Sequence, residues 1–401
     1  MGILEKIKEI ELEMSRTQKN KATEYHLGQL KAKLARLRTQ LQEGGSKSGG
    51  AGEGFEVSRY GDARVALIGF PSVGKSTLLT RLTGTKSEAA SYEFTTLTCI
   101  PGVIKYNDAK IQLLDLPGII EGASEGKGRG RQVIAVCKSA DLLLMVLDAG
   151  KPHYHREILT RELEAVGVRL NRRPPAISIR RKKTGGVSVS STVPLTRIDE
   201  RATARVLSEY KMHNADVLFR EDCDVDDLID VIEGNRKYVR CLYVYNKIDI
   251  CSMEEVDEIA RRPHSVPVSC HQDLNLTNLL ARMWDEMGLV RAYTKRVGHK
   301  PDFADPVVLS EDRGGTAVKD LCAQIHHSLV DEFQYALVWG CSAKHAPQRC
   351  GLAHKLADED VVQIVKKKIQ GGGEDGKGRF KQGPGEYVKL ADREKKKPLK
   401  T

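Results

Sequence analysis

The chain has 401 residues, 29% of them charged and 40% hydrophobic, which is typical of globular proteins and predicts two to four modules. Its nine cysteines include no C-x-x-C pair, which argues against a disulfide framework or a zinc site. No apolar run approaches the length of a membrane span and the first residues lack a signal-peptide core, so we expect a cytoplasmic protein with no membrane contact. The net charge of +10 predicts an anionic partner.

Residues 1–43 have the pattern of two amphipathic helices joined by a turn. Apolar residues recur every three or four positions on both sides of a polar break at 17–21. The segment carries nine Lys or Arg against six Asp or Glu. Two interpretations stay open: a hairpin packed on the neighbouring domain, or a basic hairpin that docks on RNA or on a partner. A Gly-rich linker follows at 44–54.

The most informative stretch is a Gly-rich loop between a predicted buried strand at 63–68 and a predicted helix that begins near Thr77. It reads G-x-x-x-x-G-K-S, and its residues are Gly69, Phe70, Pro71, Ser72, Val73, Gly74, Lys75 and Ser76. Such a loop wraps its backbone N–H groups around phosphates at the positive end of a helix. Lys75 is expected to neutralise β- and γ-phosphate charge, and the Ser76 hydroxyl to bind Mg²⁺.

Two further segments complete the expected phosphate and metal site. The polar loop Y-E-F-T-T at 92–96 offers a second hydroxyl for Mg²⁺, and we choose Thr96 over Thr95. A predicted strand at 111–115 ends in D-x-x-G, where Asp115 is expected to hold the metal through water and the Gly118 N–H to sense the γ-phosphate.

Two features beyond D-x-x-G concern turnover. The next residue, Ile119, has an alkyl side chain that cannot orient a water molecule, so catalytic polarisation must come from an ion, a backbone group or a partner. The Gly-rich basic loop at 122–130 reads as a γ-phosphate switch or as a plain surface loop. A buried strand at 142–147 and a helix at 156–166 follow.

The segment at 166–198 carries eight Lys or Arg and no Asp or Glu. Its β-rich patches at 176–179 and 187–193, followed by a helix at 201–210, predict a small basic insertion. Such a charge run is either a solvated face or a nucleic-acid contact, and both interpretations stay open.

The predicted sheet resumes at 241–245 and ends in Asn246-Lys247-Ile248-Asp249. The Asp249 carboxylate can accept hydrogen bonds from guanine N1–H and its 2-amino group, which adenine does not present in that arrangement. Asn246 is expected to brace the loop and the Lys247 stem to cover the base. After a predicted strand at 266–270, Ser269 and Cys270 are expected to face the guanine O6 edge, and a helix at 274–287 closes the domain.

At this point the chain resembles a known family. It resembles a translation-factor-class GTPase in the order of five motifs: GFPSVGKS, YEFTT, DLPG, NKID and SC. The stretch GKGRGRQVIAV closely resembles the developmentally regulated GTP-binding (DRG) family, a group of Obg-related GTPases, and its type-2 branch in particular. The resemblance implies an α/β fold: a P-loop GTPase doubly wound sheet with an N-terminal helical hairpin, a small α+β insertion and a C-terminal β-grasp (TGS) domain. The expected boundaries are 1–60 for hairpin and linker, 61–169 and 235–290 for the G domain, 170–234 for an S5-domain-2-like insertion, 291–369 for the TGS domain and 370–401 for a disordered basic tail.

The resemblance also implies an activity. We expect GTP hydrolysis with Mg²⁺ bound by Ser76, Thr96 and Asp115, with Lys75, Thr96 and Gly118 as catalytic groups, in a switch that acts on the ribosome. Relatives stimulated by K⁺ often carry Asn where this chain has Ser72, so K⁺ is compatible with this residue but not indicated by it. The implied partners are GTP and GDP, the ribosome or RNA, and a DRG family regulatory protein. The alternative is an RNA- or ribosome-binding scaffold in which GTP is mainly structural.

Overall fold

The computed structural model describes residues 3–18, 20, 23–43, 61–83, 100–116, 136–151 and 154–367. Predictions for the linker at 44–54, the loops at 92–96 and 122–130, and the tail at 370–401 lie outside these residues. Among the helices that the structure describes, none combines the length and the apolar character that a membrane span needs.

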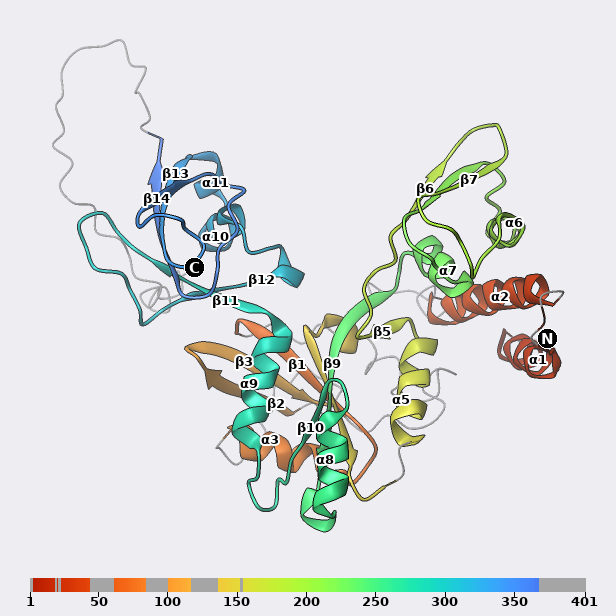
Figure 1. The fold of residues 1–401 in the computed structure, drawn as a ribbon, viewed down its shortest axis with the longest axis horizontal. Helices are drawn as coiled ribbons and strands as arrows, with labels where there is room; N and C mark the ends of the chain where they lie inside the picture. Colours follow the sequence, from red (N-terminus) through yellow and green to blue (C-terminus); the bar gives the residue numbers. More distant parts are fainter. Residues whose placement is uncertain are drawn as a thin grey trace, which may run out of the picture.

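A seven-stranded sheet forms the centre of the molecule (Figure 1). Its strand order is β10-β9-β4-β1-β3-β2, with β5 paired to β9. All pairs are parallel except β2 with β3, so the carboxyl ends of five strands meet at one edge. The strands are β1 (Ala63–Ile68), β2 (Ile100–Tyr106), β3 (Ala109–Asp115), β4 (Leu142–Asp148), β5 (Val168–Leu170), β9 (Lys237–Asn246) and β10 (Ser265–Pro267).

Helices cover both faces of this sheet, which confirms the predicted doubly wound arrangement. α3 (Lys75–Thr83) and α9 (Leu276–Met287) contribute to the core on one face, while α5 (Tyr154–Ala165) and α8 (Met253–Arg261) contribute to the core on the other. The strands that lie between two such layers are mostly apolar, and every residue of β1 is buried, including Arg64, which donates to Gln112 of β3 at 3.1 Å. A short 3₁₀ helix at Ile248–Ile250 follows β9.

The predicted insertion contains its own three-stranded sheet, ordered β6-β8-β7. β6 (Ile177–Arg181), β7 (Val187–Ser191) and β8 (Ala215–Phe219) share a core with α6 (Glu200–Glu209) and α7 (Val225–Glu233). Arg169 of β5 and Arg236 both pair with the buried Asp230 of α7, at 2.6 and 3.1 Å. Arg169, one of the eight basic residues of 166–198, is therefore a half-buried structural residue and not a free surface charge.

The N-terminal helices α1 (Ile3–Arg16) and α2 (Glu24–Glu43) form the predicted hairpin, and α2 packs on α6 and α7 of the insertion. Ala32 of α2 is buried in the insertion core, and Tyr25 donates a hydrogen bond to Asp199 at 2.9 Å. Sequence reading had left the neighbour unnamed. The structure places the hairpin against a module about 160 residues further along the chain.

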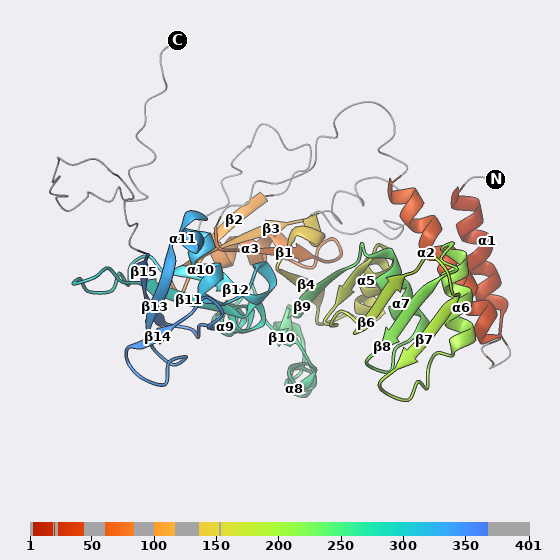
Figure 2. The same ribbon diagram turned by 90° about the horizontal axis from the view of Figure 1, so that it is seen from above.

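The C-terminal module is a five-stranded sheet ordered β12-β11-β15-β13-β14, with α10 (Val318–Ile325) and α11 (Ser328–Asp331) beside it. The strands are β11 (Leu289–Thr294), β12 (Val307–Ser310), β13 (Phe333–Trp339), β14 (Gln348–Cys350) and β15 (Asp360–Lys366), with a 3₁₀ turn at Glu311–Arg313. This module and the insertion lie on opposite sides of the central sheet (Figures 1 and 2). The exact domain boundaries stay predictions.

Candidate nucleotide-binding site

The Gly-rich loop connects β1 to α3 at the carboxyl edge of the central sheet, and two of its glycines cannot be replaced without strain. Gly69 has φ +155°, and a Cβ there would lie 2.4 Å from the Val146 carbonyl oxygen. Gly74 has φ +95°, and a Cβ there would lie 2.4 Å from the Asn246 amide nitrogen. The loop therefore depends on glycine where it passes neighbouring segments.

The predicted phosphate and metal residues lie together at the start of α3. The Lys75 ammonium donates to the carbonyl oxygens of Gly69 and Phe70, at 3.0 and 2.8 Å. Burial lowers the pKa of Lys75, and the charge of Asp115 opposes that shift. The Ser76 hydroxyl donates to the Asp115 carboxylate at 2.5 Å, so two oxygen ligands of the kind that Mg²⁺ prefers are in contact.

The base-recognition residues are held by hydrogen bonds across two loops. The Ser269 hydroxyl donates to the Asp249 carboxylate at 2.6 Å, and this bond lowers the pKa of Asp249. The buried Asn246 side chain donates to the Val73 carbonyl at 2.9 Å and accepts from the Cys270 N–H at 3.1 Å. Asn246 thus joins the phosphate loop to both base-side loops, as expected of a bracing residue.

The Ser269 hydroxyl and the Cys270 N–H both donate to side chains of the protein, and their contact with the guanine O6 edge stays a prediction. They hold Asp249 and Asn246 in place because strands β9 and β10 end side by side and bring their loops into contact.

A cavity of about 410 Å³ lies between the Gly-rich loop and the two base-side loops, and Lys75, Ser76 and Asp115 are not among its lining residues. Its phosphate side is formed by Ser72, Gly74 and Thr77, and its base side by Asn246, Lys247, Asp249 and Cys270. Cavities of 300–1,000 Å³ are the usual size for small-molecule ligands. Pro71 is exposed beside the loop, Val73 is buried beneath it, and the Phe70 ring lies 4.8 Å from His155.

Sequence reading missed three residues of this site. Asp148, at the end of β4, lies in register with Asn246 and accepts a hydrogen bond from Lys247 at 2.7 Å. Arg81 lines the cavity from α3 and pairs with Asp273 at 3.0 Å. Asp148 could have been found, since it also ends an apolar parallel strand, whereas nothing local marks the other two.

Four residues singled out from the sequence, Thr95, Thr96, Gly118 and Ile119, lie outside the described residues. Within the part of the chain that the structure describes, no group of three or more His, Cys, Asp or Glu could hold a metal ion. A Mg²⁺ site built from one carboxylate, hydroxyls and phosphate oxygens does not need such a group.

Comparisons with known proteins agree with this geometry. Residues 64–182 match the family described as 50S ribosome-binding GTPase, residues 184–289 match the C-terminal region of that domain, and residues 290–366 match the TGS domain. Developmentally-regulated G-protein 2 of Arabidopsis thaliana is 69% identical over 400 residues, which cover 100% of both chains. Developmentally-regulated GTP-binding protein 2 of Homo sapiens is 61% identical over 367 residues, which cover 92% of this chain and 100% of the human protein. The chain belongs to the developmentally regulated GTP-binding protein family and is a GTP-binding protein with a GTPase domain.

Proposed function

We propose that the chain binds GTP in the cavity between the Gly-rich loop and the base-recognition loops, hydrolyses it with Mg²⁺, and thereby switches its contacts with the translation machinery. The observation that carries the proposal is the cavity itself, where phosphate-binding and guanine-selective groups face each other and share one buried brace, Asn246. A site that bound only phosphate would not need the Asp249 carboxylate, which the Ser269 hydroxyl holds at the base side of the cavity.

The residues at the start of α3 fit a magnesium ion. Ser76 and Asp115 would hold it, the latter through water, and Thr96 is proposed as the further hydroxyl. When bound, the ion would offset charge on the phosphate oxygens. The Lys75 ammonium, which contacts the loop carbonyls of Gly69 and Phe70, would add positive charge there, and the backbone N–H groups at the start of α3 would donate to the phosphate. The source of the catalytic polarisation, K⁺ included, stays a question for the assay.

The ribosome part of the proposal rests on charge. Arg180, Arg181 and Lys183, here named the strand-edge cations, are exposed at the end of edge strand β6. Other basic residues nearby are partly neutralised: Lys182 pairs with Asp216, and Arg197 lies 3.5 Å from Asp224. The strand-edge cations are therefore the part of the insertion best suited to phosphate contacts. A cytoplasmic site of action and a DRG family regulatory protein as partner belong to the same proposal.

Hydrolysis of labelled GTP and ATP by the purified chain, with Mg²⁺ or with a chelator, tests the enzymatic part. We expect slow GTP turnover, on the order of 10⁻⁴ to 10⁻² s⁻¹, that needs Mg²⁺ and is lost in Lys75→Ala. Equal turnover of ATP, or GTP turnover that survives Lys75→Ala, would contradict the proposal.

A further inference from the structure

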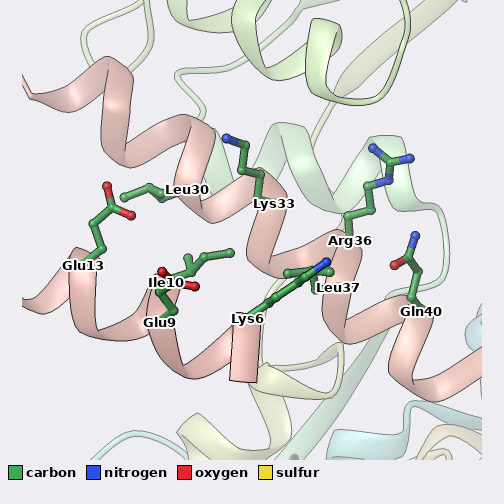
Figure 3. Close-up of a pocket in the computed structure, with 9 residues that line it drawn as sticks. All are labelled: Lys6, Glu9, Ile10, Glu13, Leu30, Lys33, Arg36, Leu37 and Gln40. Atoms are coloured by element: carbon green, nitrogen blue, oxygen red, sulfur yellow. The ribbon is translucent and has the colours of Figure 1, made fainter. Parts of the chain in front are cut away.

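The outer side of the N-terminal hairpin carries a groove that nucleotide binding does not use (Figure 3). The groove has a volume of about 490 Å³ and follows the line between α1 and α2. The helices are antiparallel there, since Lys6 of α1 lies beside Leu37 of α2 while Glu13 lies toward Leu30 (Figure 3). This groove favours the interpretation of the hairpin as a docking surface over that of a hairpin that only packs on its neighbour.

The floor of the groove is apolar. Leu30 is buried, while Ile10 and Leu37 are half-buried and line the open side. Two helices can bury only the stripe along which they touch, and a third helix is what usually covers the remaining edges.

The opposite side of α2 is already occupied by the insertion. Lys31 pairs with Asp226 of α7 at 2.6 Å, and Thr39 donates to Glu233 of the same helix at 2.9 Å. The hairpin is thus anchored on one side, and the groove lies on the side that this packing leaves open.

The two walls of the groove differ in net charge: α1 contributes two carboxylates and one cation, Lys6, and α2 contributes two cations. On α1, Glu9 and Glu13 are four residues apart and both are exposed. On α2, Lys33 is exposed and Arg36 is half-buried, three residues further on. Three of these side chains already have contacts: Glu13 contacts His26 at 2.8 Å, Lys33 lies 3.8 Å from the Glu209 carboxylate of α6, and Arg36 donates to the Glu209 backbone carbonyl at 3.0 Å.

We propose that this groove binds one amphipathic helix of a partner protein. At a rise of 1.5 Å per residue, the lining residues of α1 span about 10 Å and those of α2 about 15 Å, which fits two to three turns of helix. Such a helix would place apolar residues at i, i+3 or i+4, and i+7 on the floor. One of its edges would be basic, toward Glu9 and Glu13, and the other acidic, toward Lys33 and Arg36.

The observations favour this occupant over two others. A nucleic acid would meet the carboxylates of Glu9 and Glu13 and an apolar floor, neither of which contacts phosphate favourably. A stable second copy of the chain would need about 800 Å² from each partner, which a floor of three apolar side chains does not supply.

Three stapled 14-residue helical peptides test the proposal by fluorescence anisotropy with the full chain. All three share one leucine stripe, and their edges are basic and acidic, both acidic, or both basic. We expect the mixed-edge peptide to bind about three- to fivefold more tightly than either of the others, the size expected from one or two exposed ion pairs. A swapped-edge peptide is not a control, because a helix can dock in the reverse direction.

Variants of the hairpin locate the binding. Ile10→Glu places a charge on the floor and should weaken the mixed-edge peptide by about 30-fold. Leu12→Glu is the matched control, since Leu12 is 50% exposed and lies outside the groove. The double variant Glu9→Lys, Glu13→Lys changes exposed side chains only and should shift the preference to the peptide with two acidic edges. GTP affinity should stay unchanged in all of them.

Any of five results would overturn the proposal. The mixed-edge peptide could fail to saturate, or bind equally to Ile10→Glu and Leu12→Glu. The charge-reversed variant could keep the wild-type ranking of peptides. Sedimentation velocity could reveal a dimer of the free chain that Ile10→Glu dissociates, and the groove would then bind a second copy. RNA could displace the peptide, and the groove would then bind a nucleic acid.

Discussion

Replacing Asn246 by Ala should uncouple the phosphate side of the nucleotide cavity from its base side. The Asn246 side chain is 3% exposed and makes one hydrogen bond to the Val73 carbonyl, at 2.9 Å, and one from the Cys270 N–H, at 3.1 Å. Alanine has neither a donor nor an acceptor in its side chain. The variant therefore leaves a carbonyl and an N–H unpaired in a buried place.

The expected size follows from those two groups. Each buried polar group left without a partner costs about 1–3 kcal/mol, and relaxation of the loops in the free protein recovers part of that cost. Nucleotide binding needs both loops in their original positions. The free energy that relaxation recovers in the free variant must therefore be spent when the nucleotide binds. We expect the Kd for GTP to rise about 10- to 100-fold, which corresponds to about 1.4–2.8 kcal/mol.

Calorimetric titration with a non-hydrolysable GTP analogue measures this effect, and urea unfolding of the free protein measures the remaining loss of stability. Asn275→Ala is the matched control. Its amide donates to the Pro267 carbonyl at 2.8 Å and supports the same base-side loop, but no hydrogen bond of its side chain to the phosphate loop is found within the described residues. A Kd for Asn246→Ala within twofold of wild type, or an equal loss in both variants, would refute the reasoning.

Three other predictions concern specificity, charge and thiol chemistry. Asp249→Asn should weaken GTP binding and favour xanthine nucleotides, whose 2-oxo group matches an amide donor. Equal affinity of the wild type for ATP and GTP in a competition assay would contradict the assignment of Asp249 to guanine recognition. Alanine at all three strand-edge cations should lower the slope of log ribosome affinity against log salt by roughly 0.7–0.9 per lost phosphate contact and leave GTP binding unchanged; an unchanged slope would mean a solvated surface. Burial raises the pKa of Cys270 to about 11, so about 0.1% of this thiol is ionised at pH 8. Alkylation, read by mass spectrometry, should therefore reach the exposed Cys341 first. It should reach Cys270 only as the pH rises toward that pKa. Equal alkylation rates at pH 8 would contradict that order.

Local patterns predicted five of the seven strands of the central sheet, and β2 and β5 were not predicted. The strand at 63–68 has the predicted bounds, and the carboxyl ends of β3, β4 and β9 lie within one residue of the prediction, although β9 begins four residues earlier than predicted. These segments are mostly apolar and end in a glycine or a polar motif, which indicates both the type of the element and its carboxyl end. Because parallel strands end at one edge, the motifs that follow β1 and β9 meet around one cavity, and several of the predicted residues line it: Ser72, Gly74, Thr77, Asn246, Lys247, Asp249 and Cys270.

What the sequence did not reveal depends on contacts between distant segments. The salt bridge between Lys247 and Asp148 forms because β4 and β9 are neighbours in the sheet. The packing of α2 on the insertion depends on small residues such as Ala32, and hydrophobic periodicity does not show that such a residue faces another module. In the C-terminal sheet, β12 and β14 are only four and three residues long, too short for a clear periodic pattern, although each pairs with the strand that precedes it. Arg169 looked like a surface charge because its partner, Asp230, lies 61 residues away.

The central claim, that GTP controls contact with the ribosome, is tested most directly by co-sedimentation of the chain with ribosomes. The full chain would be loaded with a non-hydrolysable GTP analogue, with GDP, or with no nucleotide, at a fixed salt concentration. The account predicts that the GTP-analogue form binds more tightly than the GDP form, and that Lys75→Ala, which cannot hold the phosphates, abolishes the difference. Equal binding in all three states would contradict the switch and leave a scaffold in which the bound nucleotide is structural.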